Sequence, residues 1–391
     1  MKRSTMANLM VACCVCSVIA QPVIAPPDPN RPPDPLSQQP VTSDPAPEEA
    51  TKRSIPGGIH VSAQNKPLPG EVTPELDAAV AKGLTALVAM QNPDGSFGDS
   101  RWGRSVAITS LSCLALMADG HIPGRGLYGE HVLKGLRFVL SNAGENGLIA
   151  AESANGPMYG HGFATLFLGE IYGMTGASSG VIADDAELAS KTHEALVKAV
   201  RLIQSTQNEE GGWRYNPVPY DADVSVTICQ VMGLRAARNA GLEVSKDVID
   251  KAVGYAKRCQ NADGGFRYQA PGGQSAWERS AAGVASLLYA GRYEDQSIES
   301  GLEYLVNVAL PENRSTRRSH YFYGHYYAVQ CMFLAGGELW ALWWPQIREE
   351  LIRTQQPDGM WNDPSVGNAY GTAMSLIILQ MPKRYLPIFQ K

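Results

Sequence analysis

The pattern Gln-x-x-x-Gly-x-aromatic occurs four times in this 391-residue chain and constrains its fold more than any other feature. Each copy lies between two segments of helical periodicity, so the repeating unit is a helical hairpin. The glycine can take the positive φ that closes a helix, the glutamine amide can bond the backbone of a neighbouring unit, and the aromatic ring can pack the joint. The copies are Gln91/Gly95/Phe97, Gln207/Gly211/Trp213, Gln260/Gly264/Phe266 and Gln355/Gly359/Trp361.

Helical segments follow Pro74 to the end of the chain and pair into six hairpins. A worn copy of the pattern lies at residues 141–148, and the unit around residues 307–319 has lost it. The first helix of each pair is amphipathic and the second is apolar nearly all round. Stacked pairs of this kind predict an all-α fold, an (α/α)6 toroid with the amphipathic helices outside and the apolar helices lining the middle. The expected pairs are 75–90 with 104–117, 131–140 with 158–172, 185–207 with 221–240, 246–260 with 275–289, 294–308 with 319–335, and 339–354 with 367–380.

The four copies resemble the glutamine–tryptophan repeats of the prenyltransferase and squalene/terpene cyclase superfamily. The resemblance covers roughly Pro74 to the C-terminus and implies the same helical barrel, here as a short, single-barrel, exported member. It also implies an isoprenoid or other apolar ligand in the central cavity. Trp340, Trp343 and Trp344 lie in an outer helix and are expected to pack the ring closed.

The start of the chain has the pattern of an export signal peptide followed by a flexible linker. Lys2 and Arg3 precede the apolar run 9–20, and Ala20 ends a small-residue cleavage site. We therefore expect a signal peptide at residues 1–20, a disordered proline-rich linker at 21–73 and the toroid at 74–391. The apolar run is too short to span a bilayer, so we expect no transmembrane helix in the mature chain and a periplasmic or extracellular location. Lipoprotein anchoring through Cys13 or Cys14 is the less favoured alternative.

Charge and cysteine usage narrow the class of protein. The formal net charge is -5, so the chain lacks the excess of basic residues that is typical of nucleic-acid-binding proteins. The cysteines beyond the signal segment match neither a zinc site nor a disulfide scaffold, and we expect them to be buried as small hydrophobic residues. They are Cys113, Cys229, Cys259 and Cys331.

Polar residues gather where the inner helices begin, and in such a ring those ends meet at one mouth of the cavity. Units two and five lie opposite each other, so His161 and His325 should face across the cavity. Asp223 should lie beside His161 and Glu278, and an acid–histidine pair there could act as general acid and base. Each residue can equally be a helix cap or a rim residue. The catalytic candidates are Asp223, His161, Glu278 and His325, and the ligand-binding candidates are Asp221, Ser225, Tyr159, Arg279, Tyr323, Tyr326 and Tyr370.

Two chemistries of the superfamily can be compared with these residues. The run from Asp221 to Ser225 resembles the Asp-x-Asp-Asp-Thr motif of class II terpene and squalene cyclases, in which the middle aspartate protonates an alkene. Asp223 has that middle position, but Val224 replaces the final acid, so ordinary acid–base work or ligand hydrogen bonding is expected of it. His325 resembles the setting of the zinc-binding histidine of protein prenyltransferases. The matching earlier turn has Glu278 and no thiol, so we expect no zinc and no other cofactor.

Whether the chain is an enzyme stays open at this level. The first hypothesis is an exported cyclase-like toroid that binds an apolar ligand, either without changing it or as an enzyme that modifies it. The second is a non-catalytic interaction module that binds a protein of the cell envelope. The third is a glycan-active toroid in which Asp223, Glu278 and Tyr326 supply acid, base and a stacking ring.

Overall fold

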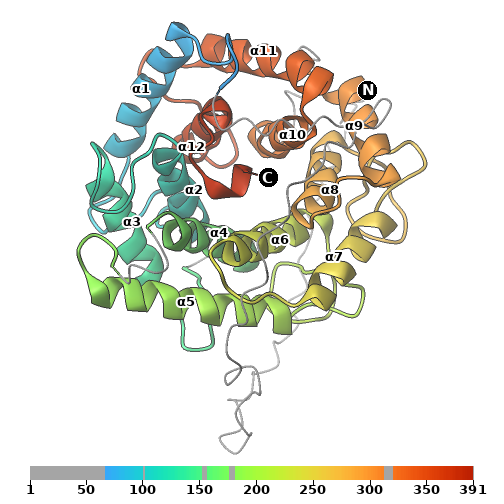
Figure 1. Ribbon diagram of the computed structural model, residues 1–391, viewed down its shortest axis with the longest axis horizontal. Coiled ribbons are helices and arrows are strands. Elements are labelled where there is room, and N and C mark those ends of the chain that lie inside the picture. The colour runs from blue at the N-terminus through green and yellow to red at the C-terminus, as the bar shows by residue number, and fades with distance from the viewer. Residues whose placement is uncertain (1–66, 100–101, 152–155, 176–180, 312–319, 391) are drawn as a thin grey trace, which may run out of the picture. The chain divides into compact units, whose positions relative to one another are not determined.

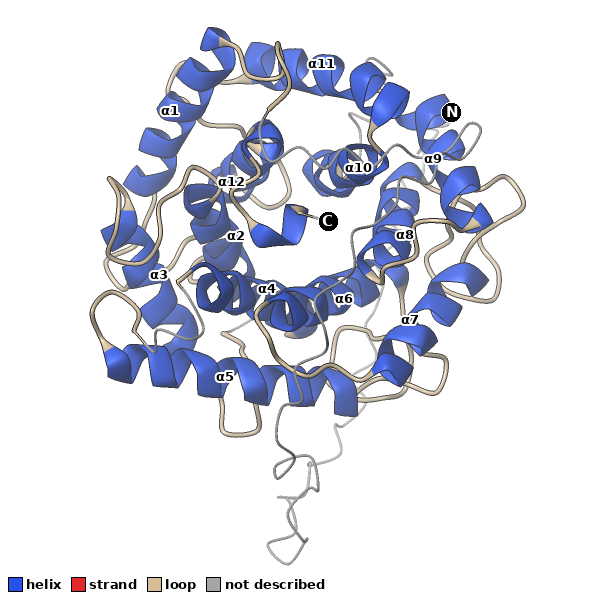
Figure 2. Ribbon diagram, in the orientation of Figure 1, coloured by secondary structure: helices blue, strands red, loops and turns tan. Residues whose placement is uncertain are grey.

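The computed structural model describes residues 67–99, 102–151, 156–175, 181–311 and 320–390. Figure 2 shows that these residues form helices joined by loops, with no sheet among them. The α-helices among them are α1 (Pro74–Ala89), α2 (Val106–Met117), α3 (Gly129–Ser141), α4 (Met158–Met174), α5 (Ala186–Ser205), α6 (Val224–Asn239), α7 (Lys246–Arg258), α8 (Trp277–Tyr289), α9 (Gln296–Ala309), α10 (Tyr321–Ala335), α11 (Gly337–Thr354) and α12 (Asn368–Leu379).

The helices form two concentric rings, with the odd-numbered helices outside and the even-numbered helices inside (Figure 1). Each inner helix contacts the next inner helix, and α12 returns to contact α2. On the outside α11 contacts α1, which completes the circuit. The predicted (α/α)6 toroid is therefore confirmed.

Burial explains which helix of each hairpin lies inside. The outer helix α1 buries one stripe, with Leu76, Val80, Leu84 and Leu87 at helical spacing. The inner helix α2 is buried at every position except Ala107, because it is covered by helices on both sides. The four cysteines in the described residues are free and buried, as predicted.

The repeated glutamines join consecutive units through their side-chain amides. Gln355 Nε2 donates to the carbonyl oxygens of Gly359 and Ala79, both at 2.9 Å, and so ties the last unit to the first. Gln91, Gln207 and Gln260 make the matching pair of bonds at their own joints. The expected role of the glutamine is confirmed in all four copies.

The glycine of the pattern has no room for a side chain. Gly211 has φ +94°, and a Cβ there would lie 2.2 Å from the carbonyl oxygen of Lys251 on the outer helix of the next unit. The aromatic ring that follows fills the joint: Trp213 is 1% exposed, and its Nε1 donates to the Ile203 carbonyl oxygen at 2.8 Å. Glycine is therefore needed for both conformation and close approach.

Two short 3₁₀ turns near the C-terminus, η4 (Met381–Lys383) and η5 (Pro387–Phe389), lie inside the ring (Figure 1). Ile388 and Phe389 are buried, and η5 contacts α4 and α6. The Ile388 N–H donates to Glu170 Oε2 at 3.1 Å, close to the C-terminal end of α4. This segment therefore fills the centre of the ring near the C-terminal ends of the inner helices, away from their N-termini.

The residues just before α1, which the sequence analysis placed at the end of the linker, contact α11. Glu71 is 6% exposed because Trp340 Nε1 donates to its Oε1 at 2.5 Å and Trp344 Nε1 to its backbone oxygen at 2.9 Å. Arg348 also donates to the Gly70 carbonyl oxygen at 2.7 Å. The ring-closing role of these tryptophans is thus confirmed for Trp340 and Trp344, and they fix residues 70–71 beside α11.

The predicted signal peptide and most of the predicted linker lie outside the described residues, which begin at residue 67. Within the described part of the chain, none of the helices combines the length and the apolarity needed to cross a bilayer.

Candidate functional site

A cavity of about 240 Å³ lies where the first turns of α2, α4, α10 and α12 meet. Its lining is mostly apolar, with polar groups contributed by tyrosines and a few other side chains. Three of the predicted ligand-binding residues, Tyr159, Tyr323 and Tyr370, line it, and their binding of a ligand stays a prediction. The lining residues that the sequence did not single out include Trp102, Val106, Ala107, Ile108, Phe163, His320 and Val366.

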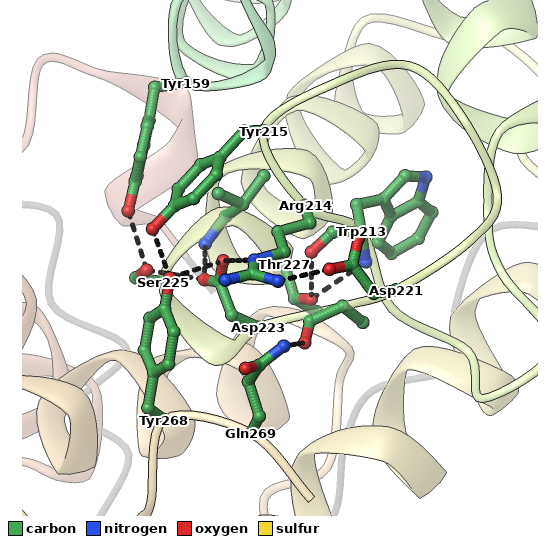
Figure 3. Close-up of polar contacts among 12 residues, drawn as sticks. Tyr159, Trp213, Arg214, Tyr215, Asp221, Asp223, Ser225, Thr227, Tyr268 and Gln269 are labelled. Atoms are coloured by element: carbon green, nitrogen blue, oxygen red, sulfur yellow. Dashed lines mark hydrogen bonds and ion pairs between the residues drawn. The ribbon is translucent and has the colours of Figure 1, made fainter. Parts of the chain in front are cut away.

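Asp223 lies just behind this cavity and caps α6. It precedes the first residue of the helix, and its Oδ1 accepts the Val226 N–H at 2.9 Å. The same oxygen accepts the Ser225 hydroxyl at 2.6 Å, while Oδ2 accepts the Tyr268 hydroxyl at 3.1 Å (Figure 3). The side chain is 0% exposed, so all solvation of this carboxyl comes from protein groups.

The environment pulls the protonation of Asp223 in two directions. Burial raises its pKa above the usual range for aspartate, and this effect is the largest. The bonds from Ser225, Val226 and Tyr268, together with the charge of Arg214, favour the ionised form and so lower the pKa, against the effect of burial. A buried carboxyl under such opposing influences is suited to accept and return a proton.

Arg214 organises the outer side of Asp223. Its guanidinium forms an ion pair with Asp221, and its Nε lies 3.7 Å from Asp223 Oδ2. It also lies over the rings of Tyr215 and Tyr268, at 5.1 and 5.8 Å from their centroids. Asp221 therefore serves as the counter-ion of Arg214, at the rim of the site.

The two tyrosines beneath Arg214 are joined through their hydroxyls. Tyr215 and Tyr268 hydrogen-bond each other, and the Tyr268 hydroxyl also donates to Asp223 Oδ2 (Figure 3). Both side chains are half-buried, so this pair connects the carboxyl with the rim of the ring.

Ser225 connects Asp223 with the cavity. The Tyr159 hydroxyl lies 2.6 Å from Ser225 Oγ, and Tyr323 donates to the Ser225 backbone oxygen at 3.4 Å. Burial raises the pKa of Tyr159, so its hydroxyl stays protonated. Four of the predicted residues, Asp223, Ser225, Tyr159 and Tyr323, thus form one connected group, in which only Tyr159 and Tyr323 line the cavity.

The expected pair of Asp223 and His161 does not form. His161 Nδ1 accepts the Ile149 N–H at 3.1 Å, and Nε2 lies 3.3 Å from the Ala199 carbonyl oxygen on the outer helix α5. Burial lowers the pKa of His161 to about 4, so the ring is neutral. It points outward because it stands two residues, about 200° of helix, from both Tyr159 and Phe163, which face the cavity.

His161 has a structural role that recurs around the ring. In the four units that keep the pattern, the N–H of the motif aromatic is accepted by a hydroxyl near the start of the inner helix. Those hydroxyls belong to Thr109, Thr227, Ser280 and Thr372, which serve Phe97, Trp213, Phe266 and Trp361. His161 does the same for Ile149, which directly follows the worn copy at residues 141–148, with a nitrogen in place of the hydroxyl.

His325 also points away from the cavity, so the two histidines do not face each other. Its ring packs against Tyr321, Trp277 and Trp343, with centroid distances of 4.5, 4.9 and 6.0 Å. Burial lowers its pKa to about 3, so it is a neutral, aromatic-packed core residue. Its position two residues after Tyr323, which lines the cavity, places it on the opposite side of α10.

Three further candidates lie outside the lining of the cavity. Arg279 Nε is 3.9 Å from Glu278 Oε1. Burial, then Asp263 and then Glu278 raise the pKa of Tyr304 on the outer helix α9, so the Glu278 carboxylate lies on that side of the ring. Tyr326 is 1% exposed and packs against Phe163 at 6.3 Å. The structure therefore brings neither Glu278 nor Arg279 to Asp223, and Tyr326 offers no accessible face for stacking.

The residues around Asp223 that the sequence reading missed do carry a signal in the sequence. Gly211–Tyr215 reads Gly-Gly-Trp-Arg-Tyr and Gly264–Tyr268 reads Gly-Gly-Phe-Arg-Tyr. Only these two copies extend the repeat with Arg-Tyr, and their tyrosines are the pair that meets beside Asp223. An extension shared by two neighbouring units and absent from the other copies indicates a site at their joint.

In the described part of the chain, no three histidine, cysteine or acidic side chains are grouped so that they could hold a metal ion. The expectation that the protein holds no zinc stays a prediction.

Comparison with known proteins gives matches in sequence and in fold. A family model described as the squalene-hopene cyclase C-terminal domain matches residues 183–333, the part that contains Asp223. The drimenyl diphosphate synthase of Streptomyces showdoensis is 26% identical over 191 residues, 48% of this chain and 32% of the relative. The match therefore spans about a third of that protein's length.

Solved structures share the fold over most of this chain. The type II terpene cyclase MstE from Scytonema, with its substrate geranylgeranyl dihydroxybenzoate, has a TM-score of 0.52 and 14% identity, covering 80% of this chain and 98% of that one. An α-1,6-mannanase variant from Salegentibacter, in complex with α-1,6-mannotetrose, has a TM-score of 0.57 and 7% identity, covering 79% and 98%. At such identities these two likenesses concern the fold alone. The chain is therefore similar in sequence to cyclases of this kind over residues that include Asp223, and its double ring of helices has the fold of the type II terpene cyclases.

Proposed function

We propose that the chain binds an isoprenoid or another apolar ligand in the cavity at the inner helix N-termini and performs acid–base chemistry on it. The observation that carries the proposal is the connection of an apolar cavity to one buried, titratable carboxyl, through Tyr159 and Ser225. Mostly apolar pockets with a few placed polar groups are the usual form of a small-molecule site.

The size of the cavity limits the ligand. An apolar cavity of roughly 150 Å³ accommodates benzene. By the same scale a cavity of about 240 Å³ holds a ligand of roughly ten carbon atoms, or one end of a longer chain. The MstE and drimenyl diphosphate synthase relatives support an isoprenoid, whereas the apolar lining gives little for a sugar to bond with.

Binding is tested by filling the cavity. Ala107 lines it, so Ala107→Trp should abolish the rise in melting temperature that geraniol produces by binding the folded state. Leu342→Trp, at an exposed position on the outer helix α11, is the matched control and should keep the full rise. An equal response to geraniol in both variants would show that the ligand does not bind in the cavity. Mannooligosaccharides run in the same assay test the glycan hypothesis.

Chemistry is tested at Asp223 itself. Asparagine caps a helix about as well as aspartate, so Asp223→Asn should keep stability and ligand affinity while losing turnover. Products of incubation with oxygenated isoprenoids are measured by mass spectrometry of organic extracts. Full turnover combined with lower thermal stability would reduce Asp223 to a cap. A protein partner that copurifies stably, with no apolar metabolite, would favour the interaction-module hypothesis.

We also propose that the protein is exported, on the basis of the basic start, the apolar run 9–20 and the small residue Ala20. N-terminal sequencing of the protein from its native host should then begin at Gln21. A sequence that begins at Met1 or Lys2 would contradict cleavage.

A further inference from the structure

Asp223 does not reach the cavity, and Tyr159 does. The Asp223 side chain is fully buried, and it is not among the described residues that line the cavity. Ser225 stands between them, 2.6 Å from Asp223 Oδ1 and 2.6 Å from the Tyr159 hydroxyl. We propose that Tyr159 is the catalytic residue that exchanges a proton with the ligand, and that Asp223 stores this proton behind Ser225. This inference rests on the proposed function of the cavity.

The two hydroxyls can be ordered in only two ways. When Asp223 is ionised, Ser225 gives its single hydrogen to the carboxylate, so Tyr159 must give its own hydrogen to Ser225. The Tyr159 oxygen then offers only lone pairs to the cavity. When Asp223 is protonated on Oδ1, the order reverses, and Tyr159 points its hydrogen into the cavity. The same wall thus switches from acceptor to donor with the state of Asp223.

The proton step balances without any other reactant. With Asp223 protonated, the Tyr159 O–H bond breaks as an O–H bond forms on an epoxide oxygen of the ligand and one C–O bond of that epoxide opens, which leaves the positive charge on carbon. Ser225 gives its proton to Tyr159, and Asp223 gives its proton to Ser225. The ligand gains one proton and one positive charge, Asp223 becomes a carboxylate, and nothing is oxidised or reduced. Such a relay suits an oxygen atom, because a phenol is far too weak an acid to protonate an alkene.

A second arm leads from Asp223 toward the rim. Its other oxygen, Oδ2, accepts from Tyr268, which bonds Tyr215 under the guanidinium of Arg214. Because both tyrosines are half-buried, water at the rim can return a proton to Asp223 along this pair. The rim arm delivers its proton to Oδ2, and a half-turn of the carboxyl about its Cβ–Cγ bond exchanges the two oxygens and brings that proton to Ser225, so Asp223 can be reloaded while a ligand fills the cavity (Figure 3).

Several titratable groups surround the stored proton and set the pH at which it leaves. Burial raises the pKa of Asp223, and Arg214 is the nearest cation that opposes this. The groups facing the carboxyl are Arg214 of its own loop, Tyr268 and Tyr255 of the next unit, Cys229 of its own helix, Tyr159 of α4 and Tyr323 of α10. Behind them, Asp221 pairs with Arg214 and Tyr215 bonds Tyr268.

The relay is tested with carvone, a neutral ten-carbon ketone, as the probe. The infrared carbonyl band of bound carvone should shift to lower frequency at a pH where Asp223 is protonated and return as Asp223 ionises. Tyr159→Phe should remove the shift, and Asp223→Asn should remove its pH dependence. Tyr323→Phe is the matched comparison, because Tyr323 also lines the cavity but bonds only the Ser225 backbone oxygen, so the pH dependence should remain. A shift that survives in Tyr159→Phe would overturn the proposal.

A titration without ligand keeps the two proposals separable. The Asp223 carboxyl, labelled with ¹³C, is titrated by NMR in the full chain. Ser225→Ala should raise its titration midpoint, because the carboxylate loses a donor. Tyr159→Phe should shift the midpoint in the wild type and leave it unchanged in the Ser225→Ala background, since Tyr159 acts only through Ser225. Additive shifts would refute the relay. Failure of carvone to bind, with the coupled titration intact, would refute only the proposed ligand.

Discussion

Replacing His161 by threonine should make the protein less sensitive to acid, and the structure gives the size of the effect. Threonine is the residue at the matching position of the next unit, where Thr227 accepts the Trp213 N–H. His161→Thr therefore keeps an acceptor for the Ile149 N–H and removes an imidazole that is buried in its neutral form.

The sign follows from the direction of the pKa shift. The pKa of His161 falls from 6.5 to about 4 on folding, so between these values the unfolded chain binds the proton and the folded chain does not. The stability from this group is fully present above pH 6.5 and is lost as the pH falls toward 4. Linkage with these two values gives a loss of about 2 kcal/mol between pH 7 and pH 5.

Urea unfolding followed by circular dichroism at pH 7 and pH 5 measures the effect. The loss of unfolding free energy between the two pH values should be about 2 kcal/mol smaller in His161→Thr than in the wild type. His193→Thr, at an exposed position on α5, is the matched control and should behave as the wild type. An equal loss in all three proteins would mean that His161 is not buried as a neutral ring.

The other predictions concern the far end of the ring and its joints. Burial raises the pKa of Glu170 from 4.5 to about 8. Between these pH values the folded chain holds a proton that the unfolded chain has released, so the stability that this group contributes falls as the pH rises toward 8. Glu170→Gln should remove about 3 kcal/mol of the loss between pH 5 and pH 8, and an unchanged pH dependence in urea unfolding would contradict this. Gln355→Ala should cost about 1–3 kcal/mol of unfolding free energy, because two backbone carbonyls at the closing joint lose their donor, and Gln356→Ala beside it should cost clearly less. Gly211→Ala should lower the melting temperature, because of its positive φ and the 2.2 Å approach to Lys251, whereas Gly254→Ala within α7 should not lower it; similar changes in both would contradict the need for glycine at the joint.

The architecture could be predicted from the sequence because the features that determine it are local and repeated along the chain. Helical periodicity shows how much of each helix is buried, and the Gln-x-x-x-Gly-x-aromatic pattern marks each joint with the residues that make its bonds. The helix starts were predicted within a few residues, although α6 begins at Val224, so Asp223 is a cap outside the helix. The prominence of Asp223 and Ser225 also came from the sequence, through the acids at the start of a buried helix.

The tertiary structure alone decided which side chains meet. His161 and Tyr159 are two residues apart on one helix, yet one bonds the outer ring and the other lines the cavity, because 200° of helix separates them. Arg214, Tyr215 and Tyr268 reach Asp223 from two loops of neighbouring units, and their loop conformation is set by contacts across the joint. Periodicity records how deeply a residue is buried and carries no information about the partner it is buried against. The sequence by itself therefore determined the ring, and the packing of its units against one another determined the site.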